Sequence, residues 1–298
     1  MKTLTIFTPT YNRAHTLTRT YQSLSAQTCK DFEWLIIDDG STDNTSEIVK
    51  QWISEADFKI RYIHQENQGM HGAHNTAYQN ITTELNTCID SDDYMPIDAV
   101  ENIVSFWNKN RNNKYAGIVG LDITRTGENI GSPFKVKATT LTDYYDLGGK
   151  GDKKIVYRTD IIHKYPDYPI FKNEKYVSLA SKYFLIDQDF KLLTLNKPLV
   201  IVEYQYDGSS INMYRQYWNN PQGFIYDRKL VLSHNPKLKK KIKYCIHYIS
   251  SKLIAQERFS IISDSPKPIT TLLVYPLGYL LYYYIKYKVH NNKKMNIK

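Results

Sequence analysis

The chain has 298 residues, which is long enough to bury one good-sized hydrophobic core together with a smaller appended part. Its three cysteines, Cys29, Cys88 and Cys245, are few, odd in number and far apart, which argues against a disulfide framework and for a reducing compartment. The apolar run at the N-terminus, residues 1–8, is too short for a signal peptide. We therefore expect a cytoplasmic protein.

The formal net charge of +9 is unevenly distributed along the chain. From Lys237 to the end, thirteen Lys or Arg stand against two acids, a net of +11, so residues 1–236 carry a net of −2. Such a basic tail indicates a partner with an anionic surface, either membrane or nucleic acid. The rest of the chain is acidic and shows no nucleic-acid-binding motif, so we expect no nucleic acid partner.

In chain order, short apolar runs alternate with amphipathic segments. Strands are predicted at residues 4–7, 34–37, 60–63 and 85–89, and helices at residues 14–26, around 48–53 and at 73–81. Four strands that alternate with three helices predict an α/β fold with a doubly wound, mostly parallel sheet. Further along, strands are predicted around residues 117–123 and 155–157, and an apolar helix at 177–186.

Polar segments follow three of the predicted strands. These segments are Thr8-Pro9-Thr10-Tyr11-Asn12-Arg13, Asp38-Asp39-Gly40-Ser41 and Asp90-Ser91-Asp92-Asp93. The carboxyl ends of parallel strands meet at one edge of a sheet, so these segments can converge on one ligand. Asp90 and Asp92 are alternate residues that can point the same way, and crowded carboxylates repel one another unless a hard divalent cation lies among them. The alternative for such an acidic triplet is a solvated turn.

These three segments, together with Asn67-Gln68-Gly69 ahead of His74-Asn75, resemble glycosyltransferase family 2 in both order and spacing. The resemblance is strong over residues 3–125 and weaker over 151–217, where it is to enzymes that build bacterial capsular or other cell-surface polysaccharides. It implies a GT-A fold and an inverting, metal-dependent transfer of a sugar from a nucleotide donor, with UDP as the expected nucleotide. The acceptor that it implies is a glycan or a lipid-linked oligosaccharide.

The resemblance also implies roles for individual residues. Residues 8–11 would cradle the nucleoside, Asp39 would accept a hydrogen bond from the base, usually uracil, and Asp90 and Asp92 would hold Mn²⁺ or Mg²⁺, with Asp92 as the direct ligand. The expected nucleotide-binding set is Thr8, Pro9, Thr10, Tyr11, Asn12, Arg13, Asp38, Asp39, Gly69, His71, Asn75, Asp90 and Ser91.

Several members of this set also have an ordinary structural interpretation. Asp38 can cap the turn at Gly40, since Asp and Gly are turn residues in any protein. Tyr11 can stack on the base or simply pack, and His71 and His74 at the start of a helix can bond either backbone or a substrate phosphate.

The general base is harder to place than the donor site. Many family members carry a Glu-Asp pair at the opening of a helix, and this chain does not show that pair. The candidates are Glu174, Asp152 and Asp187, with Asp189 beside the last. Glu174 precedes the predicted helix at 177–186, where a Glu would also compensate the helix dipole, so both interpretations stay open. A protein that binds a nucleotide sugar without catalysis, as a scaffold, is the alternative function.

The expected domains are residues 1–220, for donor binding and catalysis, and residues 221–298, a helical basic and aromatic extension. The loop at 205–210 is expected to offer tyrosine faces to sugar rings. The apolar stretch at 269–289 reaches the length of a spanning helix only by counting six tyrosines and two lysines. We therefore expect a helix that lies on the inner leaflet and holds the protein peripherally on the cytoplasmic membrane, the alternatives being a buried helix or an oligomer contact.

Overall fold

The computed structural model of the chain describes residues 2–203 and 213–295, so the loop at 205–210 lies outside the described residues. The chain divides into two compact units, which are described separately: Met1–Asp167 with Lys182–Gln205, and Tyr168–Ser181 with Tyr206–Lys298. This division falls at other residues than the expected domains, 1–220 and 221–298. Residues 168–181 belong with the C-terminal helices because the Glu174 carboxylate accepts hydrogen bonds from the backbone N–H groups of Gln222 and Gly223, and Tyr176 stacks on Phe224.

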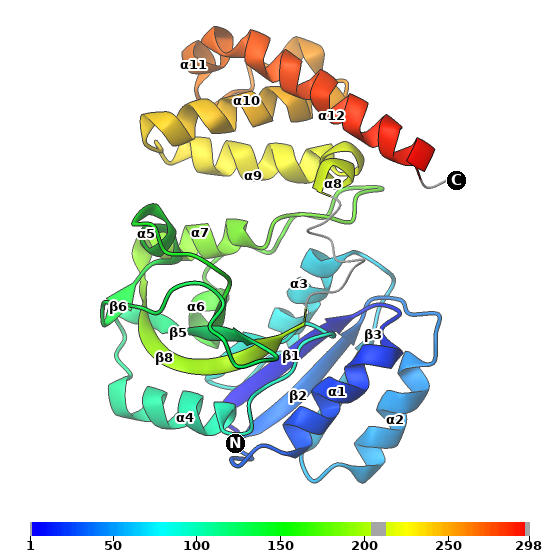
Figure 1. Cartoon of the computed structure of the whole chain (residues 1–298), viewed down its shortest axis with the longest axis vertical. Helices are drawn as coiled ribbons and strands as arrows, with labels where there is room; N and C mark the ends of the chain where they lie inside the picture. Colours follow the sequence, from blue (N-terminus) through cyan, green and yellow to red (C-terminus); the bar gives the residue numbers. More distant parts are fainter. Residues whose placement is uncertain (1, 204–212, 296–298) are drawn as a thin grey trace. The chain divides into compact units, whose positions relative to one another are not determined.

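An eight-stranded sheet forms the first unit, in the order β3-β2-β1-β4-β7-β5-β8-β6 (Figure 1). The strands are β1 (Leu4–Thr10), β2 (Phe32–Asp38), β3 (Lys59–His64), β4 (Leu85–Cys88), β5 (Tyr115–Thr124), β6 (Ala138–Thr139), β7 (Lys153–Arg158) and β8 (Lys191–Val202). β1 pairs in parallel with β2 and β4, and β2 with β3, whereas β7 is antiparallel to β4 and β5. The predicted doubly wound, mostly parallel α/β sheet is confirmed.

Helices cover both faces of the four N-terminal strands. They are α1 (Ala14–Ser25), α2 (Thr45–Glu55), α3 (Met70–Asn80) and α4 (Ala99–Asn110). Leu4 and Ile6 of β1 share a core with apolar residues of α1, α2 and α4. Alternate residues of a strand point to opposite faces, so Phe7 faces the other way, where its ring meets His74 and Tyr78 of α3. Figure 1 shows α1 and α2 beside the β1–β3 part of the sheet.

Three shorter helices complete this part of the chain: α5 (Leu141–Asp146), α6 (Thr159–Ile162) and α7 (Ala180–Asp189). Helix α7 begins three residues later than the predicted helix at 177–186 and continues three residues further.

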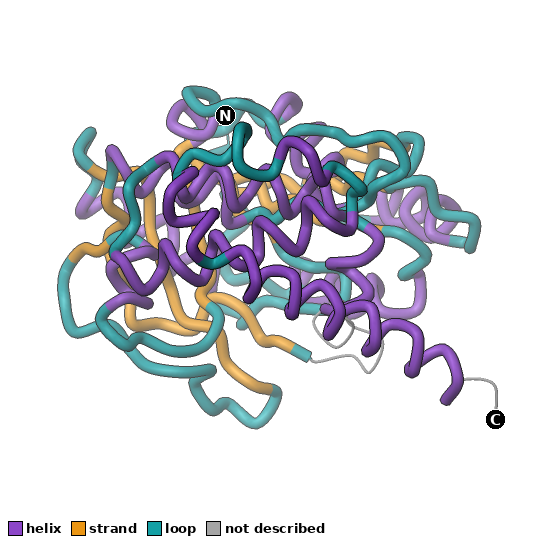
Figure 2. The backbone as a smooth tube through the Cα atoms, turned by 90° about the horizontal axis from the view of Figure 1, so that it is seen from above, coloured by secondary structure: helices purple, strands orange, loops and turns teal. Residues whose placement is uncertain are grey.

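The second unit is helical, with α8 (Met213–Asn219), α9 (Pro221–Ser233), α10 (Leu238–Ile254), α11 (Pro268–Leu273) and α12 (Tyr275–Met295). Its core contains Ile225 and Leu232 of α9 and Tyr248, Ile249 and Leu253 of α10. Helix α12, the long helix that leads to the C-terminus in Figure 2, approaches α10 closely at Gly278, where a Cβ atom would lie 2.5 Å from the Ile249 side chain.

The apolar stretch at 269–289 is two helices and not the single helix expected. The chain turns at Val274, and α12 then starts with Pro276 in its first turn, where a proline needs no hydrogen-bonded N–H. None of the helices in the described part of the chain has the length and apolarity that a bilayer crossing requires.

Candidate active site

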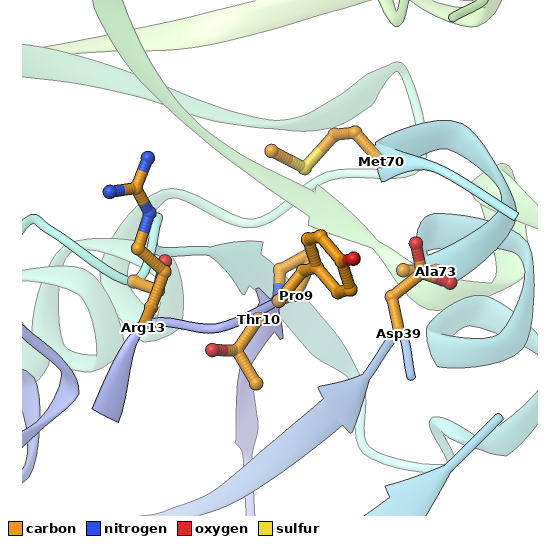
Figure 3. A pocket seen from close by; sticks show the side chains of 8 residues that line it. Pro9, Thr10, Arg13, Asp39, Met70 and Ala73 are labelled. Carbon is orange, nitrogen blue, oxygen red and sulfur yellow. The ribbon is translucent and has the colours of Figure 1, made fainter. Parts of the chain in front are cut away.

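The ends of β1, β2 and β4 meet at one edge of the sheet and enclose a cavity of about 200 Å³. Its lining residues are Pro9, Thr10, Tyr11, Arg13, Asp39, Met70, Ala73 and Ser91. Figure 3 shows Pro9, Thr10 and Arg13 on one side of this cavity, and Asp39 with Met70 and Ala73 on the other. Six of the eight lining residues belong to the expected nucleotide-binding set, and only Met70 and Ala73, from the first turn of α3, were missed.

Asp39 is the buried charged group of this cavity, with a residue exposure of 4%. One carboxylate oxygen accepts hydrogen bonds from Gln65 Nε2 at 2.7 Å and from the backbone N–H of Gln68 at 2.8 Å, and the other accepts from the N–H of Gly69 at 2.8 Å. Gly69 has a φ of 83°, a backbone conformation that favours glycine. Its N–H donates to the Asp39 carboxylate. Asp39 therefore fixes the loop that leads into α3, and the same loop fixes the direction of its carboxylate.

Asp38 stabilises the turn at Gly40, as one of the two interpretations of this residue predicts. It is fully buried, and its carboxylate accepts from the Ser41 N–H at 2.8 Å and from the Tyr62 hydroxyl at 2.5 Å. Burial and the hydrogen bond to Asp38 raise the pKa of Tyr62 to about 12. Asp38 is not among the residues that line the cavity, and its contact with a nucleotide remains an expectation.

Thr8 and Asn12 also hold the cavity wall and do not line it. The Thr8 hydroxyl is buried and accepts a hydrogen bond from Trp34 Nε1 at 3.0 Å. Asn12 adopts a φ of 53°, and its Oδ1 accepts from the backbone N–H of Thr42 at 2.7 Å, which ties the turn after β1 to the turn after β2. Both side chains therefore have partners within the protein, and their contacts with a nucleotide remain expectations.

Thr10 and Tyr11 face the cavity and are suited to bind a ligand. The Thr10 hydroxyl is buried and has no hydrogen-bond partner within the described residues, although a buried hydroxyl is stabilised only when it has one. The Tyr11 side chain is 49% exposed and offers an aromatic face. Both features fit a ligand that brings a hydrogen-bonding group and a flat ring.

Three polar residues of α3, His71, His74 and Asn75, are buried. His74 Nδ1 is 2.9 Å from the Met70 carbonyl oxygen, so the expected backbone bond is present, and burial lowers the pKa of His74 to about 4 and keeps the ring neutral. His71 and Asn75 are 1% and 8% exposed, and neither lines the cavity. Their expected contacts with a nucleotide are not seen in the geometry of this cavity.

The carboxylates that follow β4 differ in exposure. Asp90 is exposed, Asp92 is half-buried, and Asp93 is 7% exposed, while Ser91 between them lines the cavity. Burial, followed by the charge of Asp90, raises the pKa of Asp93 to about 8. One Asp93 oxygen accepts from the Glu203 N–H at 3.1 Å, which ties this loop to the end of β8.

Two further charged residues near these carboxylates were missed by the sequence analysis. Lys154 of β7 donates from Nζ to the Cys88 carbonyl at 2.9 Å, and the charges of Asp122 and Asp90 raise its pKa against the effect of burial. Asp122 of β5 is 4% exposed, and burial raises its pKa to about 6 although Lys154 opposes the shift. The sequence does contain a signal for Asp122, because a charged residue inside the apolar run at 117–123 is unusual.

Asp90 and Asp92 offer the oxygen ligands that a hard cation prefers. In residues 2–203 and 213–295, no three or more His, Cys, Asp or Glu side chains are grouped closely enough to hold a metal ion by themselves. Mg²⁺ is usually bound through one or two carboxylates together with substrate phosphates, and the donor set present fits that mode.

The three candidates for a general base have different surroundings. Glu174 binds the N-terminus of α9, at 2.9 Å from the Gln222 N–H, and not the N-terminus of α7 as expected. Asp187 caps α5 by accepting from the Thr142 N–H at 2.8 Å. Asp152 is exposed and directly precedes β7. Because β7 runs antiparallel to β4, the first residues of β7 lie beside the loop after β4 that carries Asp90.

Comparison with known proteins agrees with this geometry. The model for glycosyl transferase family 2 matches residues 5–165. The glycosyltransferase GlyA of Streptococcus pneumoniae is 40% identical over 100 residues, which are 34% of this chain and 14% of that protein. The GalNAc(5)-diNAcBac-PP-undecaprenol β-1,3-glucosyltransferase of Campylobacter jejuni is 28% identical over 139 residues, which are 46% of this chain and 43% of that protein. The chain thus spans less than half the length of either relative.

Solved structures show the same fold. TarS 1-349 of S. aureus in complex with UDP-GlcNAc superposes with a TM-score of 0.56 at 18% identity, over 93% of this chain and 92% of that one. The mannosyltransferase PcManGT from Pyrobaculum calidifontis, in complex with GDP-Man and Mn²⁺, gives 0.57 at 16% identity, over 95% and 82%. Because the family model covers more than half of the sequence, the chain belongs to glycosyl transferase family 2, and its fold is of the GT-A type.

Proposed function

We propose that the chain transfers a sugar, with inversion, from a UDP-sugar that binds in the cavity at the ends of β1, β2 and β4. The observation that carries the proposal is the convergence of Thr10, Asp39 and Ser91 on one cavity, from three strand ends that are far apart in the sequence. Ser91 lies between Asp90 and Asp92, so a nucleoside in this cavity would extend its diphosphate toward the two carboxylates.

In this proposal the nucleoside is recognised by three side chains. Asp39 is the acceptor for the N3–H of uracil, since a carboxylate accepts and does not donate. Its bonds to Gln68 and Gly69 hold it in place before the ligand arrives, which lowers the entropy lost on binding. Tyr11 stacks on the base, and the buried Thr10 hydroxyl bonds the nucleoside.

For the diphosphate, we propose that Asp90 and Asp92 hold Mn²⁺ or Mg²⁺, with Asp92 as the direct ligand. The metal would supply Lewis-acid stabilisation of the charge that grows on the leaving diphosphate. Arg13, which also lines the cavity, carries a fixed positive charge suited to the same oxygens. The Mn²⁺ in the PcManGT structure supports this part of the proposal.

Asp152 is our choice for the general base. It would take the proton from the acceptor hydroxyl while that oxygen attacks the anomeric carbon and the bond to the diphosphate breaks, which inverts the configuration. Glu174 and Asp187 are less suited because each already binds backbone N–H groups at a helix N-terminus. Asp152 lies near the Asp90 loop and is exposed to an incoming acceptor.

We propose a glycan or lipid-linked oligosaccharide of a surface polysaccharide as the acceptor, reached from the cytoplasmic side of the membrane. The name of the Campylobacter jejuni relative, which contains undecaprenol, supports a lipid-linked acceptor, and the net charge of +11 from Lys237 onward supports peripheral attachment.

The test is release of UDP from UDP-sugars, with and without Mn²⁺ and with and without a lipid-linked glycan. We expect Mn²⁺-dependent release that the acceptor accelerates. Binding of UDP-sugars without any turnover would instead favour the non-catalytic scaffold.

A further inference from the structure

Helix α12 is apolar on two opposite sides, and only one of them is buried in its own unit. Gly278, Ile285 and Val289 are spaced at helical intervals and are buried, with Gly278 against Ile249 of α10. The opposite side remains exposed by 45% to 66% at five positions, which are Leu277, Leu280, Tyr283, Tyr284 and Tyr287.

Exposed apolar residues also occur in the segments that precede α12 in the chain. In α11, Ile269, Leu272 and Leu273 are exposed by 77%, 62% and 75%. Phe259, in the 3₁₀ turn Arg258–Ser260 that follows α10, is fully exposed. We call these nine residues of α11, α12 and the 3₁₀ turn the α11–α12 face. Contiguous exposed apolar residues in such number mark a site of interaction with a protein or a membrane.

The charges around the α11–α12 face are almost all positive. Within residues 258–291 the cations are Arg258, Lys267, Lys286 and Lys288, and the single acid is Asp264. Asp264 is itself compensated, because Lys252 Nζ lies 2.8 Å from its carboxylate. The Lys288 ammonium lies 5.5 Å from the ring centroid of Tyr284, so cations and tyrosines are interleaved at the edge of the apolar surface.

We propose that the α11–α12 face docks on an anionic lipid bilayer, with α12 parallel to the membrane plane. Phe259 and the leucines enter the boundary between headgroups and acyl chains, the tyrosines lie at headgroup level, and the cations meet the lipid phosphates. This docking rests on the proposed function only because that function places the acceptor at a membrane. The surface that binds the membrane is the α11–α12 face, and the lipids that it binds are anionic.

A second copy of the chain fits this surface less well. Pairing two identical faces about a two-fold axis would bring Arg258, Lys267, Lys286 and Lys288 of both copies together, and like charges across an interface oppose association. An anionic bilayer complements the same cations.

Co-sedimentation of the full chain with vesicles tests the proposal. We expect binding to vesicles that contain phosphatidylglycerol, weaker binding to pure phosphatidylcholine, and partial release at high salt, since screening weakens the charge contribution. The double variant Leu273→Glu/Leu280→Glu should bind the anionic vesicles at least tenfold more weakly. The control is Ile97→Glu, which places one such charge on an apolar residue with 60% exposure in the sheet unit and should bind like the natural chain.

Two further measurements, UDP binding and light scattering, separate membrane docking from misfolding and from dimer formation. UDP binding by calorimetry, without vesicles, shows whether the double variant is folded and tests the donor site independently of the membrane. Light scattering reports the oligomeric state. Lys286→Glu/Lys288→Glu reverses two charges and leaves the exposed apolar side chains in place, so it should weaken binding to the anionic vesicles. Vesicle binding that is absent at low salt, or equal for the double variant and the natural chain, would overturn the proposal. So would a dimer that the double variant dissociates, because the face would then bind a second copy.

Discussion

The carboxylate of Asp39, at the end of β2, accepts a hydrogen bond from the backbone N–H of Gly69 at 2.8 Å. This bond joins two turns that are 30 residues apart in the sequence and sets the entry to α3, whose first turn supplies Met70 and Ala73 to the cavity. The residue proposed to recognise the base is thus also the residue that shapes the opposite wall of its cavity.

Replacing Asp39 by Ala should affect both stability and nucleotide binding. The N–H groups of Gln68 and Gly69 would lose their partner, so we expect the free energy of unfolding to fall by about 1–3 kcal/mol. UDP should bind at least tenfold more weakly, about 1.4 kcal/mol, and lose its advantage over CDP. Urea unfolding and calorimetry measure the two effects, with Asp57→Ala, which breaks an exposed ion pair, as the control. If UDP keeps its preference over CDP, Asp39 anchors the loop and does not read the base.

The sequence was sufficient to predict the N-terminal half of the sheet and most of its cavity. Strands that end in polar segments are visible as apolar runs, and parallel pairing brings their ends together whatever the distance in sequence. Pro9, Thr10, Tyr11 and Arg13 could therefore be placed at the edge of the sheet where the cavity lies from the sequence alone.

Which polar residue faces the ligand could not be predicted in the same way. Asp38 and Asp39 are adjacent, but the hydrogen-bond partner of Asp38, Tyr62, lies on β3, and nothing in the local sequence predicts that contact. Asn12 likewise looks like a ligand residue until the turn after β2 is placed beside it. Long-range hydrogen bonds decide these roles, and sequence periodicity does not contain them.

The division into compact units differs from the expected domains for a related reason. Residues 168–181 precede strand β8 in the chain, so a boundary drawn along the sequence leaves them with the sheet. The Glu174 carboxylate instead binds the first turn of α9, 48 residues further on.

Asp92→Asn should abolish the metal dependence of UDP binding. An amide is a weaker ligand for a hard cation than a carboxylate, so the gain in UDP affinity on adding Mn²⁺ should fall at least tenfold, about 1.4 kcal/mol. The unfolding midpoint should stay unchanged because Asp92 is half-buried and lies in a loop. Asp98→Asn is the matched control, since this exposed Asp makes no side-chain cap bond at α4. An Mn²⁺ effect that stays within threefold in Asp92→Asn would remove the metal assignment.

Asp122→Asn should change how stability depends on pH. Burial raises the pKa of Asp122 to about 6, so the folded state binds this proton more tightly than the unfolded state does. In the natural chain, ionisation of Asp122 therefore lowers stability as pH rises from about 4 to about 6, and the loss is complete above that range. Asn does not ionise, so the variant should gain about 2–3 kcal/mol relative to the natural chain between pH 4 and pH 8. Urea unfolding of both proteins at pH 4 and pH 8 measures this gain. A difference in the free energy of unfolding between variant and natural chain that is the same at both pH values would contradict the raised pKa of Asp122.

Asp152→Asn should slow transfer without weakening the donor complex. Loss of a general base lowers kcat by about 10²–10⁴-fold, whereas UDP affinity should remain within twofold because Asp152 does not line the cavity. Steady-state kinetics with a lipid-linked glycan measures both. A kcat close to that of the natural chain would exclude Asp152 as the base.

Glu174→Ala should give the opposite pattern. Removing the cap of α9 should lower the free energy of unfolding by about 1–2 kcal/mol while kcat, measured well below the melting temperature, stays within twofold. If the variant remains folded but its kcat falls as far as expected for Asp152→Asn, Glu174 is the better candidate for the general base.

The cavity at the ends of β1, β2 and β4 should bind a uridine diphosphate sugar together with a divalent metal, and every role proposed above depends on this. The decisive measurement is calorimetric titration of the natural chain with UDP, UDP-GlcNAc and GDP-Man, each with and without Mn²⁺. We predict that the two uridine nucleotides bind at least tenfold more tightly with Mn²⁺ than without, and more tightly than GDP-Man under the same conditions. Equal affinities with and without the metal, or tighter binding of GDP-Man, would contradict the proposal.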